Sequence, residues 1–190
     1  KVKYLNYNIS NKKTIKYLSL KQFDYVVNLG GYIEHLNLKK VVSGHYHVVK
    51  NLYNYFRNKN LKSFIQIGSS AEYGRAKVPH KENFLCKPAG IYGKYKLKST
   101  NFLLDKFKKN RFPVTVIRFY QVYGPKQNID RFIPILINAC IKNIKFPSSH
   151  GKQKRDFLYV DDAISAILNS LNNKACKGKI INIGSGKPIT

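Results

Sequence analysis

The sequence has no continuous run of about 18 uncharged apolar residues, the length that a helix needs to cross a bilayer. Its first residues also lack the long apolar stretch of a secretory signal peptide. Cysteine is scarce: the three cysteines are widely spaced and form neither a CxxC pair nor a Cys/His pattern typical of zinc sites. We therefore expect a cytoplasmic protein with reduced thiols, no disulfide framework and no metal site.

Acidic side chains are also few. The chain has 35 Lys and Arg against 9 Asp and Glu, which gives a formal net charge of +26. Such a charge makes nucleic acid a possible partner. However, the basic residues are spread along the whole chain, and no recognised nucleic-acid motif is present. We therefore do not expect specific nucleic-acid binding, and the same positive field would attract a substrate that carries two phosphates.

A third absence concerns glycine. The sequence contains no GxGxxG or GxxGxxG, the glycine-rich turn that opens a dinucleotide-binding βαβ unit. Gly184-Ser185-Gly186 lies near the other end and does not open a predicted helix. The simplest expectation is that the chain starts inside a longer protein, after its first βαβ segment.

The pattern of apolar residues predicts one α/β domain. With 190 residues and 43% hydrophobic content, the chain is long enough to form a sizeable core. Short β-rich runs alternate with longer amphipathic stretches, as in βαβ units around a parallel sheet. We predict strands near 25–29, 64–68, 114–118 and 180–183, helices over 41–56, 91–108, 131–141 and 162–171, and rim loops at 74–88 and 123–128.

Tyr92 and Lys96 lie four residues apart in a predicted helix. Residues at this spacing share one helix face, so we expect the ammonium to lower the pKa of the phenol. A tyrosine tuned in this way exchanges protons near neutral pH. In a chain with 14 Tyr and 35 Lys plus Arg the match also arises by chance, and the pair would then be an ordinary exposed helix pair.

Six segments, taken in order, resemble one known family. The sequence is similar to the extended short-chain dehydrogenase/reductase family, in its NAD-dependent epimerase/dehydratase branch. The resemblance implies a Rossmann-type parallel sheet flanked by helices, incomplete at the N-terminus, with part of a smaller substrate-side lobe from about 125–155 and 184–190. The matching segments are FDYVVNLGG (23–31), IGSSAEYG (67–74), YGKYK (92–96), IRFYQVYGP (117–125), RDFLYVDD (155–162) and INIGSG (181–186).

The resemblance implies a catalytic group of three residues. Tyr92 would take or give a proton at a sugar hydroxyl or carbonyl, and Lys96 would hold the nicotinamide ribose. Ser70 would hydrogen-bond the same sugar oxygen, with Ser69 as the alternative because the segment is one residue shorter than the common family form. Glu72 would be the base if the enzyme catalyses dehydration or decarboxylation, although Ala71 lacks the acid that one dehydratase group has there.

Other residues would bind the cofactor. Gly30 and Gly31 stand where the family often has two alanines, and small residues leave room for the cofactor. A tight turn is the alternative reading of this pair. His45 replaces a common asparagine near the cofactor, and a histidine that only packs a helix is the alternative. Phe119 would also contact the cofactor.

Two residues are expected to contact the substrate. Gln121 replaces the family's usual asparagine in the loop after Arg118. Arg155 would bind the nucleotide diphosphate, because a guanidinium is permanently charged and bidentate. Arg118 itself is expected to support the end of its strand.

Taken together, the resemblance predicts an NAD- or NADP-dependent nucleotide-sugar epimerase or 4-keto-sugar reductase. We expect the full-length protein to be a homodimer that acts in polysaccharide or deoxysugar synthesis. One alternative is a dehydratase or decarboxylase of the same fold. Another is a non-catalytic fragment that binds nucleotide sugar or nucleic acid.

Overall fold

The computed structural model describes residues 2–18, 22–32 and 37–190. Its centre is a parallel four-stranded sheet with the order β1-β2-β3-β6. All four predicted strands are confirmed, within a residue or two at each end. They are β1 (Tyr25–Asn28), β2 (Ser63–Ile67), β3 (Val114–Phe119) and β6 (Ile180–Ile183).

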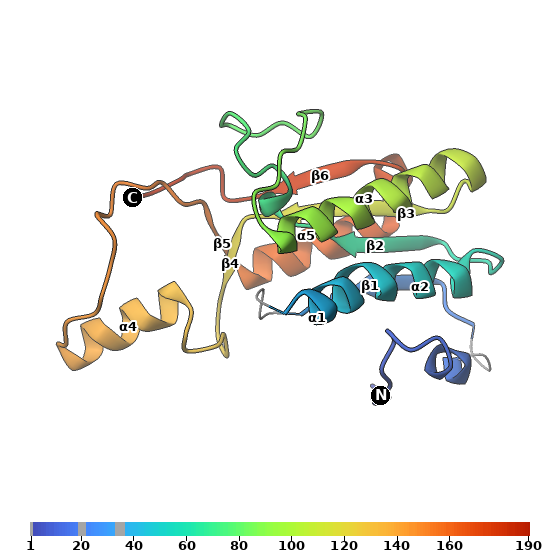
Figure 1. Cartoon of the computed structure of the whole chain (residues 1–190), viewed down its shortest axis with the longest axis horizontal. Helices are drawn as coiled ribbons and strands as arrows, with labels where there is room; N and C mark the ends of the chain where they lie inside the picture. Colours follow the sequence, from blue (N-terminus) through green and yellow to red (C-terminus); the bar gives the residue numbers. More distant parts are fainter. Residues whose placement is uncertain (1, 19–21, 33–36) are drawn as a thin grey trace.

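Helices cover both faces of this sheet (Figure 1). On one face lie α3 (Ile91–Asn110) and a continuous helical segment formed by α1 (Leu38–Val42), a π-helical turn (Ser43–His47) and α2 (Val48–Phe56). On the other face, α5 (Val160–Asn172) contacts β2 and β3. The predicted helices are therefore confirmed, and the arrangement is a Rossmann-type fold.

The core lies between the sheet and the α2–α3 layer. β2 and β3 are covered on both faces, and seven of their eleven residues are apolar β-branched or aromatic residues. Twelve buried side chains form the main hydrophobic cluster, to which α2 contributes the largest share. They are Ile15, Val48, Val49, Leu52, Tyr53, Phe56, Leu61, Phe64, Leu103, Phe112, Val114 and Val116.

Two short strands were not predicted from the sequence. β4 (Gln121–Tyr123) and β5 (Phe157–Tyr159) pair in parallel beside the main sheet. Between them the chain forms α4 (Phe132–Lys142), which stands apart from the main body in Figure 1 and buries only Ala139. This segment overlaps the range 125–155, for which a substrate-side lobe remains a proposal.

The C-terminal end of α3 is fixed to the start of β6 by a close contact. Gly178 has a φ of +76°, and a Cβ there would lie 2.1 Å from the Phe107 ring. Only glycine combines this backbone conformation with such a close approach. The Gly178 amide also donates a hydrogen bond of 2.6 Å to the carbonyl of Val114.

Over the described ranges, no helix is both long and apolar enough to cross a bilayer.

Candidate active site

A large open cleft lies beyond the carboxyl ends of the strands, where open parallel sheets bind ligands. Its volume is about 1550 Å³. The segments that follow β2, β3 and β6 all contribute to its wall, together with the first turns of α3 and α4. Four residues predicted for the site line it: Ser70, Tyr92, Gln121 and Arg155.

Tyr92 and Lys96 lie on the same face of α3, as their spacing predicts. The Lys96 ammonium lies 5.8 Å from the centre of the Tyr92 ring. Lys96 is buried, and its Nζ donates a hydrogen bond of 2.8 Å to the carbonyl of Ile67 at the end of β2. Tyr92 is half-buried and reaches the cleft, whereas Lys96 lies behind it.

The predicted direction of the tyrosine pKa is wrong. Burial is the main influence and raises the pKa of Tyr92, and the charge of Glu72 acts in the same direction. A hydrogen bond with Ser69 and the charge of Arg131 lower it, but they do not offset burial. The phenol therefore stays protonated at neutral pH. In this protonated state it can donate a proton.

The hydroxyl that meets Tyr92 belongs to Ser69, the alternative that the shortened segment left open. Ser69 begins a short 3₁₀ turn, and its Oγ accepts the amide of Ala71 at 3.2 Å. Its side chain also forms the hydrogen bond that lowers the pKa of Tyr92. Ser70 lines the cleft one residue later. This hydrogen bond favours Ser69 over Ser70 as the partner of the tyrosine.

A glycine allows this turn to approach α3. A Cβ on Gly93 would lie 2.5 Å from the carbonyl oxygen of Ala71, a distance that no real Cβ adopts. Gly93 follows Tyr92 directly, so the same contact sets the separation between the serine turn and the tyrosine.

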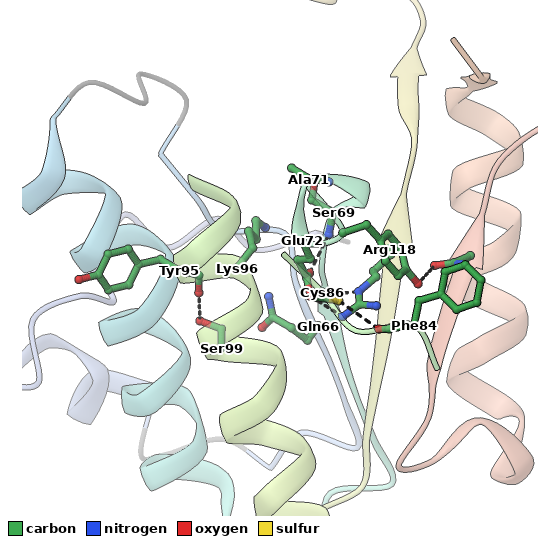
Figure 2. Close-up of polar contacts among 12 residues, drawn as sticks. Gln66, Ser69, Ala71, Glu72, Phe84, Cys86, Tyr95, Lys96, Ser99 and Arg118 are labelled. Atoms are coloured by element: carbon green, nitrogen blue, oxygen red, sulfur yellow. Dashed lines mark hydrogen bonds and ion pairs between the residues drawn. The ribbon is translucent and has the colours of Figure 1, made fainter. Parts of the chain in front are cut away.

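Glu72 does not face the cleft. Its carboxylate is fully buried and pairs with Arg118, whose side chain is 1% exposed, at 2.8 Å from Nη2 and 3.0 Å from Nε. Its other oxygen accepts the amide of Ser69 at 3.0 Å, which completes a capping box. Figure 2 shows Glu72 between Ser69 and Arg118. The expectation that Glu72 acts as a base is not supported, because the carboxylate is fully engaged inside the protein.

Removing one partner of this buried pair should destabilise the folded protein. We expect Glu72→Ala to lower the free energy of unfolding by about 3–5 kcal/mol, because it leaves the Arg118 charge buried without a counterion. Urea unfolding followed by circular dichroism measures this loss.

The exposed pair between Lys62 and Asp24 is the matched control, since both side chains are more than 60% exposed. Asp24→Ala should lower the free energy of unfolding far less than Glu72→Ala does, because water already solvates both charges of the exposed pair. Equal losses in the two variants would contradict the structural role of Glu72.

Lys96 gives a second prediction. Burial lowers its pKa from 10.5 to about 8. Between these values the unfolded chain holds a proton that the folded protein lacks, so stability gains from Lys96 as the pH rises from 8 to 10.5. The unfolding free energy of the wild type, relative to Lys96→Met, should therefore increase across this range. A constant difference between the two proteins would contradict the buried position of the ammonium.

Gly30 and Gly31, which were predicted to contact the cofactor, do not line this cleft. Gly30 and Gly31 line a second cavity of about 780 Å³ beside β1. A Cβ on Gly30 would lie 2.9 Å from Asn28 Oδ1, and one on Gly31 would lie 2.6 Å from the His45 ring. The room that the two glycines leave is thus filled by the protein's own side chains, Asn28 and His45.

His45 packs the π-helical turn against its surroundings, which is the alternative that the sequence left open. It is 4% exposed and lines neither cavity. Its Nε2 lies 3.2 Å from the amide nitrogen and 3.1 Å from the carbonyl oxygen of Tyr32, and its carbonyl accepts the Ser99 hydroxyl at 2.6 Å. Its ring meets Tyr92 edge-on at 5.0 Å. His45 therefore supports α3.

Phe119 also lines neither cavity. It is the last residue of β3 and pairs with Ile183 of β6. The prediction that Phe119 contacts the cofactor is therefore not supported.

A stack of aromatic rings in the cleft wall was not predicted from the sequence. His80 stacks on Tyr73 at 4.4 Å between ring centres, and its Nδ1 lies 3.1 Å from the Tyr120 hydroxyl. Tyr73 in turn donates to Asn182 at 2.8 Å. Burial lowers the pKa of His80 and raises that of Tyr120 to about 12, so both side chains are neutral at pH 7. His80, Tyr120 and Asn182 all line the cleft.

A turn after β6 forms another part of the cleft wall. The Asp156 carboxylate accepts the amide of Ser185 at 2.6 Å, the Ser185 hydroxyl at 2.8 Å and the amide of Gly186 at 3.0 Å. Arg155, next to it, exchanges two backbone hydrogen bonds with Ile189. Asp156 therefore holds the wall that carries Arg155.

No cluster of three or more metal-ligating side chains occurs within the described ranges.

Comparison with known proteins shows the family. Residues 2–184 match the model of the NAD dependent epimerase/dehydratase family. The chain therefore belongs to that family.

Two curated relatives differ in their reactions. The chain is 30% identical over 134 residues to an uncharacterised UDP-glucose epimerase of Bacillus subtilis, covering 69% of this chain and 42% of that protein. It is 28% identical over 147 residues to a dTDP-D-glucose 4,6-dehydratase of Dictyostelium discoideum, covering 70% of this chain and 34% of that protein. The chain thus matches less than half the length of either relative.

The fold is similar to that of a UDP-glucuronic acid 4-epimerase from Bacillus cereus, solved with UDP-glucuronic acid and NAD. The TM-score is 0.83 at 27% identity, over 97% of this chain and 59% of that one. Pal from Bacillus thuringiensis gives a TM-score of 0.88 at 26% identity, over 96% of this chain and 61% of that one.

Proposed function

We propose that this chain forms the catalytic cleft of an NAD(P)-dependent nucleotide-sugar epimerase or 4-keto-sugar reductase. The observation that carries the proposal is the hydroxyl pair of Ser69 and Tyr92 on the cleft wall, with the Lys96 ammonium behind it. Family membership and the relatives that act on nucleotide sugars support the same reading.

In this mechanism a sugar oxygen lies between Ser69 and Tyr92. Ser69 orients the oxygen, and the protonated Tyr92 delivers a proton to it when a ketone is reduced. The reverse step returns the proton to Tyr92 when an alcohol is oxidised. The bound nicotinamide supplies or accepts the hydride.

The residues present fit such a cofactor at its nicotinamide end. The Lys96 ammonium has three N–H donors and uses one on the Ile67 carbonyl, so two remain for ribose hydroxyls. The Tyr92 hydroxyl lies on the same face of α3. The backbone of Gly30 and Gly31 would border the cofactor along the second cavity.

The nucleotide diphosphate would bind on the wall formed by β5 and the turn after β6. Arg155 and Lys154 supply the positive charge, and Gln121 lies on the same cleft. Arg155 is suited to phosphate because its guanidinium offers parallel N–H donors.

The dehydratase alternative loses support from the position of Glu72. A base must reach the sugar, whereas this carboxylate is fully buried and paired with Arg118. Ala71 supplies no acid beside it. Neither residue favours elimination over epimerisation or reduction. A cytoplasmic homodimer, paired through two helices, remains part of the proposal on the family resemblance alone.

Tyr92→Phe tests this proposal. The change should lower turnover of a nucleotide sugar in the presence of NAD(P) by about 10²-fold or more, because it removes the proton donor. Binding of UDP-glucose, measured by calorimetry, should change little. Turnover at the wild-type rate would refute the assignment.

Ser69→Ala and Ser70→Ala form a matched pair in the same assay. Loss of the Ser69 hydroxyl should reduce turnover strongly, whereas loss of the Ser70 hydroxyl should have a small effect. A larger loss of turnover in Ser70→Ala than in Ser69→Ala would show that Ser70 orients the sugar oxygen.

A further inference from the structure

Tyr120 is a second phenol on the cleft wall, and the proposed proton transfer does not use it. It is half-buried and lines the cleft. Its amide donates to the Ile183 carbonyl at 3.2 Å, and its carbonyl accepts the Val122 amide at 3.0 Å, so its backbone is held at the end of β3. Burial is the main cause that raises the pKa of Tyr120 to about 12, so the hydroxyl keeps its proton. A neutral, ordered hydroxyl in a cleft is suited to bind a polar atom of a ligand.

The pairing of β2 with β3 brings Tyr120 near the serine turn. Ile67 of β2 is in register with Ile117 of β3. Ser69 lies two residues beyond Ile67, and Tyr120 lies three residues beyond Ile117. Neighbouring strands are about 4.8 Å apart, so the two residues leave adjacent strands at nearly the same level. A sugar ring whose oxygen is held at Ser69 can therefore reach Tyr120.

His80 holds the hydroxyl of Tyr120. His80 Nδ1 lies 3.1 Å from the Tyr120 hydroxyl, and the two rings are roughly parallel, at 25° with 6.0 Å between their centres. His80 itself stacks on Tyr73, which is fully buried. A phenol has one donor and also accepts hydrogen bonds, so the contact with one ring nitrogen leaves Tyr120 with capacity for a ligand.

The loop that carries His80 is anchored to β6. Asn182 of β6 donates from Nδ2 to the His80 carbonyl at 3.3 Å and accepts the Tyr73 hydroxyl at 2.8 Å. The Asn182 amide also donates to Glu82 Oε1 at 2.9 Å. One residue of the sheet thus contacts the loop before, at and after His80. A hydroxyl that is ordered in advance loses less conformational entropy when it binds a ligand.

We propose that Tyr120 binds a second hydroxyl of the substrate's sugar ring, and that His80 positions Tyr120 for this contact. The inference rests on the proposed function and adds a substrate contact to it. Ser69 and Tyr92 hold one sugar oxygen, about which the ring is still able to turn. A second contact fixes the orientation of the ring, so that the reacting carbon faces the nicotinamide. Tyr120 thereby selects sugars that have a hydroxyl within its reach.

Calorimetric titration of the whole chain with UDP-glucose and with UDP tests this inference, because only the first probe carries a sugar ring beyond the diphosphate. Tyr120→Phe removes the hydroxyl and retains the ring. We expect this variant to bind UDP-glucose about three- to tenfold more weakly, as for the loss of one neutral hydrogen bond. Its affinity for UDP should change little.

Tyr53→Phe is the matched control. The Tyr53 hydroxyl accepts a hydrogen bond from Asn110 at 2.7 Å, and Tyr53 lines neither cavity. The control therefore removes a bonded phenol hydroxyl away from the cleft. It should retain the wild-type affinity for both probes.

A double variant tests the role of His80. His80→Phe keeps an aromatic ring to stack on Tyr73 but removes the nitrogen that meets Tyr120. It should weaken the binding of UDP-glucose and not that of UDP. Because His80 acts through Tyr120, the variant with both changes should lose no more affinity than Tyr120→Phe alone. Circular dichroism checks that each variant is folded.

Several outcomes would overturn the inference. Wild-type affinity for UDP-glucose in Tyr120→Phe would exclude the second contact, while the proposed function would stand. An equal loss of affinity for UDP and UDP-glucose would show that Tyr120 acts on the nucleotide instead. Additive losses in the double variant would show that His80 does not act through Tyr120. Failure of the wild type to bind UDP-glucose would remove the proposed function as well.

Discussion

The buried ion pair between Glu72 and Arg118 is the constraint on which the rest of the site depends. It connects the turn after β2 to the end of β3, so two neighbouring strands present their loops in a fixed relation. Burying two charges has a large desolvation cost. The hydrogen bond that Glu72 accepts from the Ser69 amide helps to offset this cost. The position of the Ser69 hydroxyl thus depends on a carboxylate that does not face the cleft.

The same pair organises the cleft wall on its other side. The Arg118 guanidinium lies 4.5 Å from the centre of the Tyr73 ring, on which His80 stacks. His80 in turn contacts Tyr120 through its Nδ1. A continuous set of contacts therefore runs from the buried charge to the surface that the substrate would touch. Neutral rings in this wall leave the arginines as its main charged groups.

The sheet and its helices could be predicted from the sequence, because β2 and β3 are short apolar runs and α3 has apolar residues at helical spacing. The sequence also placed Tyr92 and Lys96 on one face correctly. The predictions from sequence failed where a property depends on how deeply a side chain is buried. Spacing cannot reveal that desolvation of Tyr92 outweighs nearby cations, or that Glu72 turns inward. β4 and β5 were missed because three residues are too few to show periodicity.

The two glycine contacts on α3 have a mechanical consequence. Gly93 meets the carbonyl of Ala71 at one end of the helix, and Gly178 meets Phe107 near the other. A helix of 20 residues, about 30 Å long, is thus in close contact with the rest of the fold near both of its ends. A larger side chain at Gly178 would collide with the Phe107 ring, so a position far outside the cleft constrains the helix that carries Tyr92.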